Sequence, residues 1–350
     1  MGTSPDDDEA QPVTAFVEGV QNHRMRKILI FTLSILALFA VDKAPVSAQH
    51  DGASPFLIGM LKGDGTLVPF AQFGNGGWWN PWPKPLHVVE TIYPEGPKAE
   101  EVLHHSLADL SEPWFTQCGN VPTSWFFWSS AGTPTTLTAV KVVKVEAHSG
   151  TNWGLMTDIP KRASTDPVHD IIGVAVTARQ KIEPFIKIKP GSTQGQEIGS
   201  FIKKIFDSVE TSELERYRVE RPAAIAKVEM SLTDLYRSSS VVNGKHIYYF
   251  DVEKQYPKVT ASGEPACNDV SLFKGWISAD EKGGLGLMDS IFFFTDCDRK
   301  GPSTMIPLGT MKLKEQIFLF VREHGWEDES YIILELNQSG LQRVLETAGA

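Results

Sequence analysis

The chain has 350 residues, of which 33 are Lys or Arg and 43 are Asp or Glu, so its formal net charge is −10 at pH 7. This acidic balance, without basic stripes, argues against nucleic acid or an anionic membrane surface as a partner. The length allows one large domain or two domains of ordinary size.

Residues 25–48 have the three parts of a secretory signal peptide. Basic side chains precede an apolar run at residues 28–41, and a small-x-small cleavage pattern at residues 46–48 lies directly before Gln49. The run has about 14 residues, whereas a membrane-spanning helix needs about 20. We therefore expect an extracytoplasmic protein, periplasmic or secreted. An uncleaved N-terminal membrane anchor is the alternative.

Residues 1–24 carry an acidic cluster at positions 6–9 and no sustained periodicity. This predicts a disordered extension or a mis-assigned start, with Met25 as the true first residue. No later stretch is apolar enough to cross a bilayer, so no stable membrane span is expected once the signal is removed.

Residues 49–190 form a β-rich first half. Two strand-like runs, 56–61 and 66–73, flank the turn signal at residues 63–65 and predict a hairpin. A short helix is expected at 98–110, because Pro97 precedes apolar residues at helical spacing. Further strands are expected at 124–129, 135–147, 171–177 and 184–188.

A helical connection at residues 191–222 follows. Apolar residues recur at i, i+3, i+4, i+7 and i+8 between Ile198 and Val209, which predicts one amphipathic helix at about 197–218. This helix lies between two β-rich halves, although one continuous domain is also compatible with the pattern.

Residues 223–350 form the β-rich second half. Asn243-Gly244 is the strongest short hairpin signal in the chain. A short helix is expected at 341–347. The predicted class is mainly antiparallel β or α+β, since no βαβ alternation appears. The expected strands are 225–235, 246–252, 270–277, 290–295, 316–322 and 331–336.

The chain contains three cysteines. Cys267 and Cys297 each lie at the edge of a predicted strand, so in an oxidising compartment they are the expected disulfide pair, with Cys118 left over. Three reduced, buried cysteines are the alternative. Zinc is disfavoured, because no CxxC or matching His spacing accompanies them.

Tryptophan is concentrated in the first half, with seven of nine between residues 78 and 153. Trp78, Trp79 and Trp82 fall in a Pro- and Gly-rich stretch that could display flat indole faces to a ligand. The competing interpretation, which we favour, is that these large aromatic side chains belong to the core.

Histidines and carboxylates provide further candidates. His148 ends a strand at a polar turn, a position where binding residues often occur. His104 and His105 precede Asp109 on the predicted helix and are better explained by a solvated face. Asp296 and Asp298 could begin a calcium loop, but the rest of that motif is absent, which favours a simple turn. Residues 322–330 are interpreted as an exposed hairpin turn.

No GxSxG, HExxH, P-loop or strand-linked GxGxxG motif occurs in the chain. The leading hypothesis is an exported, β-rich binding or interaction protein without catalytic machinery, cofactor or metal, whose ligand is a carbohydrate or protein of the cell envelope. Two alternatives remain: an exported hydrolase of polysaccharides or esters that uses carboxylates or His148, and a component of a cell-envelope assembly.

Overall fold

The computed structural model describes residues 14–15, 55–81, 123–128, 134–147, 150–160, 171–216, 228–259, 265–298, 302–325 and 329–348. These residues form a mostly antiparallel β protein with a single long helix between β-rich regions, as predicted. The expected signal peptide at 25–48, the expected helix at 98–110 and Cys118 lie outside the described residues. Within the described residues, no helix is long and apolar enough to cross a membrane.

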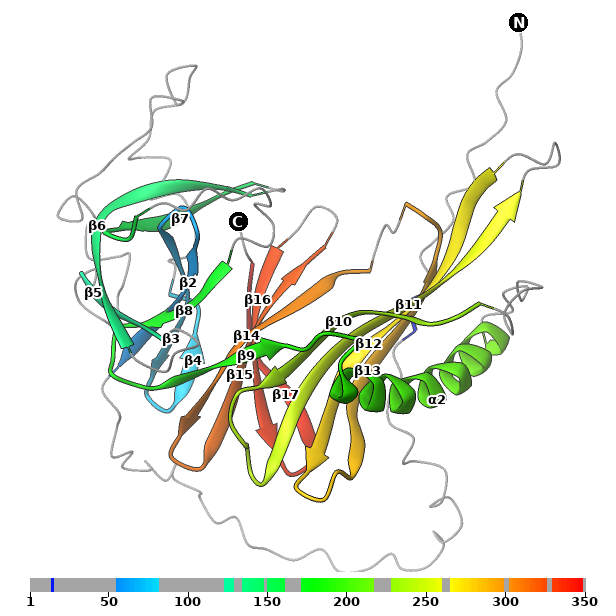
Figure 1. Ribbon diagram of the computed structural model, residues 1–350. Coiled ribbons are helices and arrows are strands. Elements are labelled where there is room, and N and C mark those ends of the chain that lie inside the picture. Colours follow the sequence, from blue (N-terminus) through cyan, green and yellow to red (C-terminus); the bar gives the residue numbers. More distant parts are fainter. Residues whose placement is uncertain are drawn as a thin grey trace, which may run out of the picture.

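The first sheet closes on itself. Its strands follow the order β2-β8-β5-β6-β7-β3, and β3 also pairs with β2, so six strands form a cylinder (Figure 1). The short strand β4 folds back from β3 and pairs with its last residues in antiparallel fashion. The strands are β2 (Phe56–Lys62), β3 (Thr66–Gly74), β4 (Gly77–Trp79), β5 (Ser124–Trp128), β6 (Pro134–Ala147), β7 (Gly150–Thr157) and β8 (Ile171–Val176).

Both faces of β2 and β3 are buried, which explains their nearly continuous apolar sequences. Leu57 and Leu61 point into the cylinder, where they pack with Trp125 and Leu137. The alternate side chains of β2 point outward and join a second core. A small closed sheet of this kind is filled by its own side chains, so its interior is a packed core and not a channel.

The second sheet has ten strands in the order β1-β13-β12-β11-β10-β9-β14-β15-β16-β17. Strand β9 precedes the helix in sequence and pairs with both β10 and β14. It therefore connects the part of the sheet that contains β10–β13 to the part that contains β14–β17. The strands are β1 (Thr14–Ala15), β9 (Ile182–Lys187), β10 (Ser231–Ser238), β11 (Lys245–Val259), β12 (Pro265–Asp280), β13 (Leu285–Thr295), β14 (Thr304–Leu313), β15 (Gln316–His324), β16 (Glu329–Asn337) and β17 (Gly340–Ala348).

The second sheet is strongly curved, and three cores cover its faces. One face of β14–β16 packs on the outside of the closed sheet through residues such as Phe320 and Tyr331. The opposite face turns inward, where Leu319 and Val321 meet Tyr249 and Trp276 from β11 and β12. The curvature brings β13, which is next to the two-residue edge strand β1, close to the opposite edge strand β17, although β13 and β17 are not hydrogen-bonded neighbours in the sheet.

Helix α2 (Thr193–Arg216) confirms the predicted amphipathic helix. It lies against the β10–β13 part of the sheet (Figure 1) and buries Ile198, Ile202 and Phe206 there. The hydroxyl of Ser192 caps its N-terminus by accepting the Gly195 N–H at 3.1 Å. A side chain at Gly195 would lie 2.5 Å from the Lys189 carbonyl oxygen, so only glycine fits this first turn.

Two local predictions in the second half had different outcomes. Asn243 and Gly244 both have positive φ, 52° and 74°, and form the predicted tight turn between β10 and β11. The short helix predicted at 341–347 is wrong, because these residues belong to β17 and pair with β16 along its length. A short apolar pattern is compatible with both the helical and the strand period, and pairing with the neighbouring strand β16 decides which structure forms.

Candidate functional site

The tryptophans predicted to bind a ligand occupy different environments. Trp78 is only 9% exposed and packs against Phe56, Phe73 and Phe318 in the core between the two sheets. Trp79, the next residue, is 49% exposed, and its indole N–H donates to the Gly74 carbonyl at 3.1 Å. Trp82 and His148 lie outside the described residues. Of the two candidates that the structure describes, Trp78 therefore belongs to the core and Trp79 to the surface.

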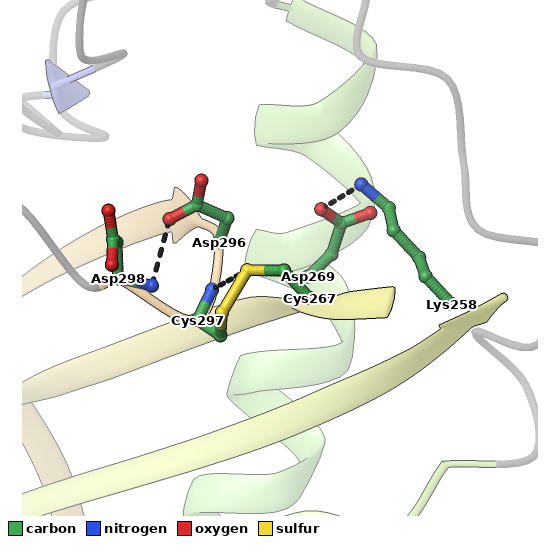
Figure 2. The surroundings of a disulfide bond; sticks show 6 residues. All are labelled: Lys258, Cys267, Asp269, Asp296, Cys297 and Asp298. Atoms are coloured by element: carbon green, nitrogen blue, oxygen red, sulfur yellow. Dashed lines mark hydrogen bonds and ion pairs between the residues drawn. A yellow bond between two sulfur atoms is a disulfide. The ribbon is translucent and has the colours of Figure 1, made fainter. Parts of the chain in front are cut away.

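Figure 2 shows Cys267 and Cys297 joined by a disulfide, with Cα atoms 5.4 Å apart. The bond lies just beyond the last β12–β13 register pair, Val270 and Thr295. Asp296 Oδ1 accepts the backbone N–H of Asp298 at 3.0 Å, which is the local turn expected for this pair. Within the described residues, no three His, Cys, Asp or Glu side chains are grouped as a metal site requires.

The segment 322–330 differs from the exposed turn expected there. Glu329 is buried on β16, where Arg322 pairs with it at 2.5 Å and the Tyr331 hydroxyl donates to it. Burial alone would raise the pKa of Glu329, but the hydrogen bonds from Arg322 and Tyr331 and the charge of Arg322 lower it overall. This ion pair joins the neighbouring strands β15 and β16, on the face where Tyr331 packs against the closed sheet. Glu327 and Asp328 lie outside the described residues.

A cavity of about 110 Å³ lies inside the curved second sheet, near the meeting of β13 and β17. It could hold several water molecules or one small ligand. Five different strands supply its lining, and both aromatic and charged side chains converge there. The lining residues are Tyr249 from β11, Lys274, Gly275 and Trp276 from β12, Asp289, Ser290 and Ile291 from β13, Met305 from β14 and Arg343 from β17.

The backbone at two glycines positions the strands around this cavity. A Cβ on Gly275 would lie 2.3 Å from the Asp289 carbonyl oxygen, so glycine is required for the close approach of β13 to β12. A Cβ on Gly340 would lie 3.8 Å from the Met288 carbonyl oxygen, which places the start of β17 beside β13. The cavity therefore lies where β13 and β17 approach each other without a ladder of hydrogen bonds.

Tyr249 provides an enclosed polar group in this cavity. The residue is 0% exposed, and among the described residues its hydroxyl makes no regular hydrogen bond, although the Met305 backbone is close enough to lower the pKa of the hydroxyl. Burial raises the pKa of this hydroxyl well above its ordinary value, so it remains a neutral donor. An unpaired buried hydroxyl is costly, and a bound polar molecule would satisfy it.

Lys274 has partners inside the sheet. Its ammonium group donates to the Ser303 carbonyl and lies 3.5 Å from the Asp251 carboxylate. Burial raises the pKa of Asp251, and the Lys274 charge offsets only part of that rise. Lys274 therefore supplies positive charge to the cavity, and Ser303 and Asp251 already hold its ammonium group in place.

Asp289 and Arg343 bring opposite charges to the cavity from β13 and β17. Asp289 is solvent-exposed, yet desolvation by the surrounding strands raises its pKa, and a hydrogen bond from the Ser290 backbone N–H and then the Arg343 charge offset part of that rise. Arg343 makes its ion pair with Glu346, at 2.6 Å, and among the described residues no ion pair joins it to Asp289. The two charges interact electrostatically across the cavity without contact.

These cavity residues were not candidates in the sequence analysis. One signal was available: Tyr249, Asp251 and Glu253 alternate along β11, so polar side chains occupy positions on a face that is apolar elsewhere. The contributions of Asp289 and Arg343 have no such signal, because they depend on the curvature that brings β13 to β17.

The fold and the cavity define a class: a mostly antiparallel β protein with a closed sheet, a curved helix-covered sheet and a small polar cavity inside the latter. Comparisons with protein-family models, curated proteins and solved structures found no match to this chain.

Proposed function

We propose that this chain is an exported, non-catalytic binding protein that takes a small polar ligand into the cavity of the second sheet. The observation that carries the proposal is the Tyr249 hydroxyl, enclosed and unpaired among the described residues on the wall of that cavity. Export rests on the signal-peptide pattern at residues 25–48.

The lining residues offer a ligand two kinds of contact, apolar and hydrogen-bonding. Trp276, Ile291 and Met305 offer apolar contacts, while Tyr249 offers a hydrogen bond that its neighbours do not satisfy. A few polar groups convergent in an otherwise apolar cavity are typical of small-molecule sites. Because strands of the sheet hold these groups, little ordering entropy would be lost on binding.

The test is calorimetric titration and thermal-shift screening of the mature chain with monosaccharides, amino acids, dicarboxylates and inorganic phosphate. A ligand of the cavity should bind about 2- to 10-fold more weakly to Tyr249→Phe, because one hydrogen bond is lost while the shape is retained. Tyr236→Phe is the matched control, since Tyr236 packs in the same core but does not line the cavity. Equal weakening by both variants, or binding that neither affects, would contradict the proposed site.

An exported hydrolase is the second candidate, and one observation favours it. Asp234 and Asp251 are directly opposite on β10 and β11. Asp234 is ion-paired with Lys187 at 2.6 Å, whereas burial raises the pKa of Asp251. Two carboxyl groups in such different environments suit a base or nucleophile and a general acid. Turnover of glycans or esters that Asp251→Asn abolishes would favour this candidate. Absence of turnover alongside tight, Tyr249-dependent binding would reject it.

A further inference from the structure

The charges at the cavity have a defined arrangement. Asp289 stands on β13 and Arg343 on β17, so a negative and a positive group line one cavity from strands near the two ends of the sheet. They affect each other electrostatically, yet Arg343 forms its ion pair with Glu346, outside the cavity. Asp289 accepts a hydrogen bond from the Ser290 backbone N–H, and neither charge pairs with the other, so a ligand that carries both charges can bridge them.

The remaining lining residues restrict the ligand further. Lys274 already donates to Ser303 and faces Asp251, so Arg343 is the cation with donors to spare. Trp276, Ile291 and Met305 form an apolar surface between the two charged edges. The space, about 110 Å³, admits only a small molecule.

We infer that the cavity binds a small zwitterion, a free α-amino acid with an apolar side chain, whose ammonium group pairs with Asp289 and whose carboxylate pairs with Arg343. Guanidinium recognises a carboxylate through two parallel hydrogen bonds, which gives the contact both strength and direction. The apolar side chain would lie on Trp276 and Met305, and Tyr249 would donate to the second carboxylate oxygen. A dicarboxylate would meet repulsion from Asp289, and a diamine would meet repulsion from Arg343. The inference rests on the proposed binding function and names its substrate class.

The experiment compares three probes by calorimetry with the mature chain: L-leucine, 4-methylpentanoate, which lacks the ammonium group, and 3-methylbutylamine, which lacks the carboxylate. Leucine should bind at least 10-fold more tightly than either analogue. Asp289→Asn and Arg343→Met should each reduce leucine affinity at least 10-fold. Asp289→Asn should also abolish the preference for leucine over 4-methylpentanoate, because leucine then loses the one contact that 4-methylpentanoate never makes.

Glu346→Gln is the matched control for Arg343→Met. It removes the same exposed ion pair from β17 but leaves the guanidinium at the cavity, so leucine affinity should not change. Equal affinity for leucine and 4-methylpentanoate would contradict the inference that the ligand is a zwitterion, but it would not contradict the proposed binding function. Failure of every probe here and in the wider screen would overturn both. Loss of leucine binding in Glu346→Gln to the same extent as in Arg343→Met would show that the ion pair and not the cavity matters.

Discussion

The ammonium group of Lys254 on β11 lies 2.6 Å from the carboxylate of Glu210 on α2, and the two side chains are only 3% and 1% exposed. Asp207 adds a second carboxylate at 2.8 Å, and the Tyr256 hydroxyl donates to Glu210. Burial alone would lower the pKa of Lys254, but hydrogen bonds to Asp207 and Glu210 raise it overall, so the lysine stays charged. This network joins the helix to the sheet beyond their apolar contacts.

Replacement of this lysine should destabilise the protein strongly. Lys254→Met leaves Glu210 buried without its cation, and removal of one partner from a buried pair costs about 3 to 5 kcal/mol. Urea denaturation followed by far-UV circular dichroism measures the loss. Lys203→Met is the control: it removes an exposed (i, i+4) pair with Asp207 worth about 0.5 kcal/mol or less. If both variants unfold at the same urea concentration as the parent, the network does not hold the helix.

The disulfide should contribute to stability through the unfolded chain. Cys267 and Cys297 are 30 residues apart, and closing such a loop stabilises by about 3 to 4 kcal/mol in the chain-entropy model. The double variant Cys267→Ser/Cys297→Ser should lose about that amount, whereas Cys118→Ser should behave as the parent. Mass spectrometry of non-reduced peptides checks the pairing directly. Three free thiols, or a bridge to Cys118, would contradict it.

The adjacent tryptophans should respond differently to truncation. Trp78→Ala removes a large side chain from among four phenylalanines and should cost about 3 to 5 kcal/mol. Trp79→Ala, at an exposed position, should cost less than about 1 kcal/mol. Melting temperatures of the two variants provide the comparison. A large loss in Trp79→Ala with little change in Trp78→Ala would reverse the assignment of core and surface.

Stability should fall in acid partly through Glu329. Its pKa in the folded chain is lowered below the usual 4.5, so its contribution is present above pH 4.5 and is lost as the pH falls through the folded value. Glu329→Gln should reduce stability by about 3 kcal/mol at neutral pH and flatten the acid slope. Urea midpoints between about pH 7 and pH 3 measure this. Glu346→Gln, at an exposed position, should retain the slope of the parent.

Much of the strand content was predictable because alternation and turn residues act locally. The hairpin at 56–73, the turn at Asn243-Gly244 and the helix stripe from Ile198 onward all depend on neighbours within a few residues. Strand β14 was missed because Pro307 and Gly309 interrupt its pattern; there the register shifts against β15 between these two residues. The C-terminal strand was misjudged as a helix because its pairing with β16 was not visible in its own seven residues.

Amino-acid composition alone could not predict which tryptophans are buried. The enrichment between residues 78 and 153 predicted either a platform or a core, and nothing local separates Trp78 from Trp79. On a strand, successive side chains point to opposite faces, so the choice depends on what covers each face. The packing of β14–β16 on the closed sheet covers Trp78 and leaves Trp79 exposed.

By itself the sequence determined the acidic charge, the β-rich class and the long helix, because each depends on composition or on neighbours along the chain. Only the tertiary structure decided the cavity, where Tyr249, Asp289 and Arg343 come from three different strands. Their meeting depends on strand register and on the curvature that brings β13 beside β17. Both arise from packing between distant segments, and local periodicity carries no information about that packing.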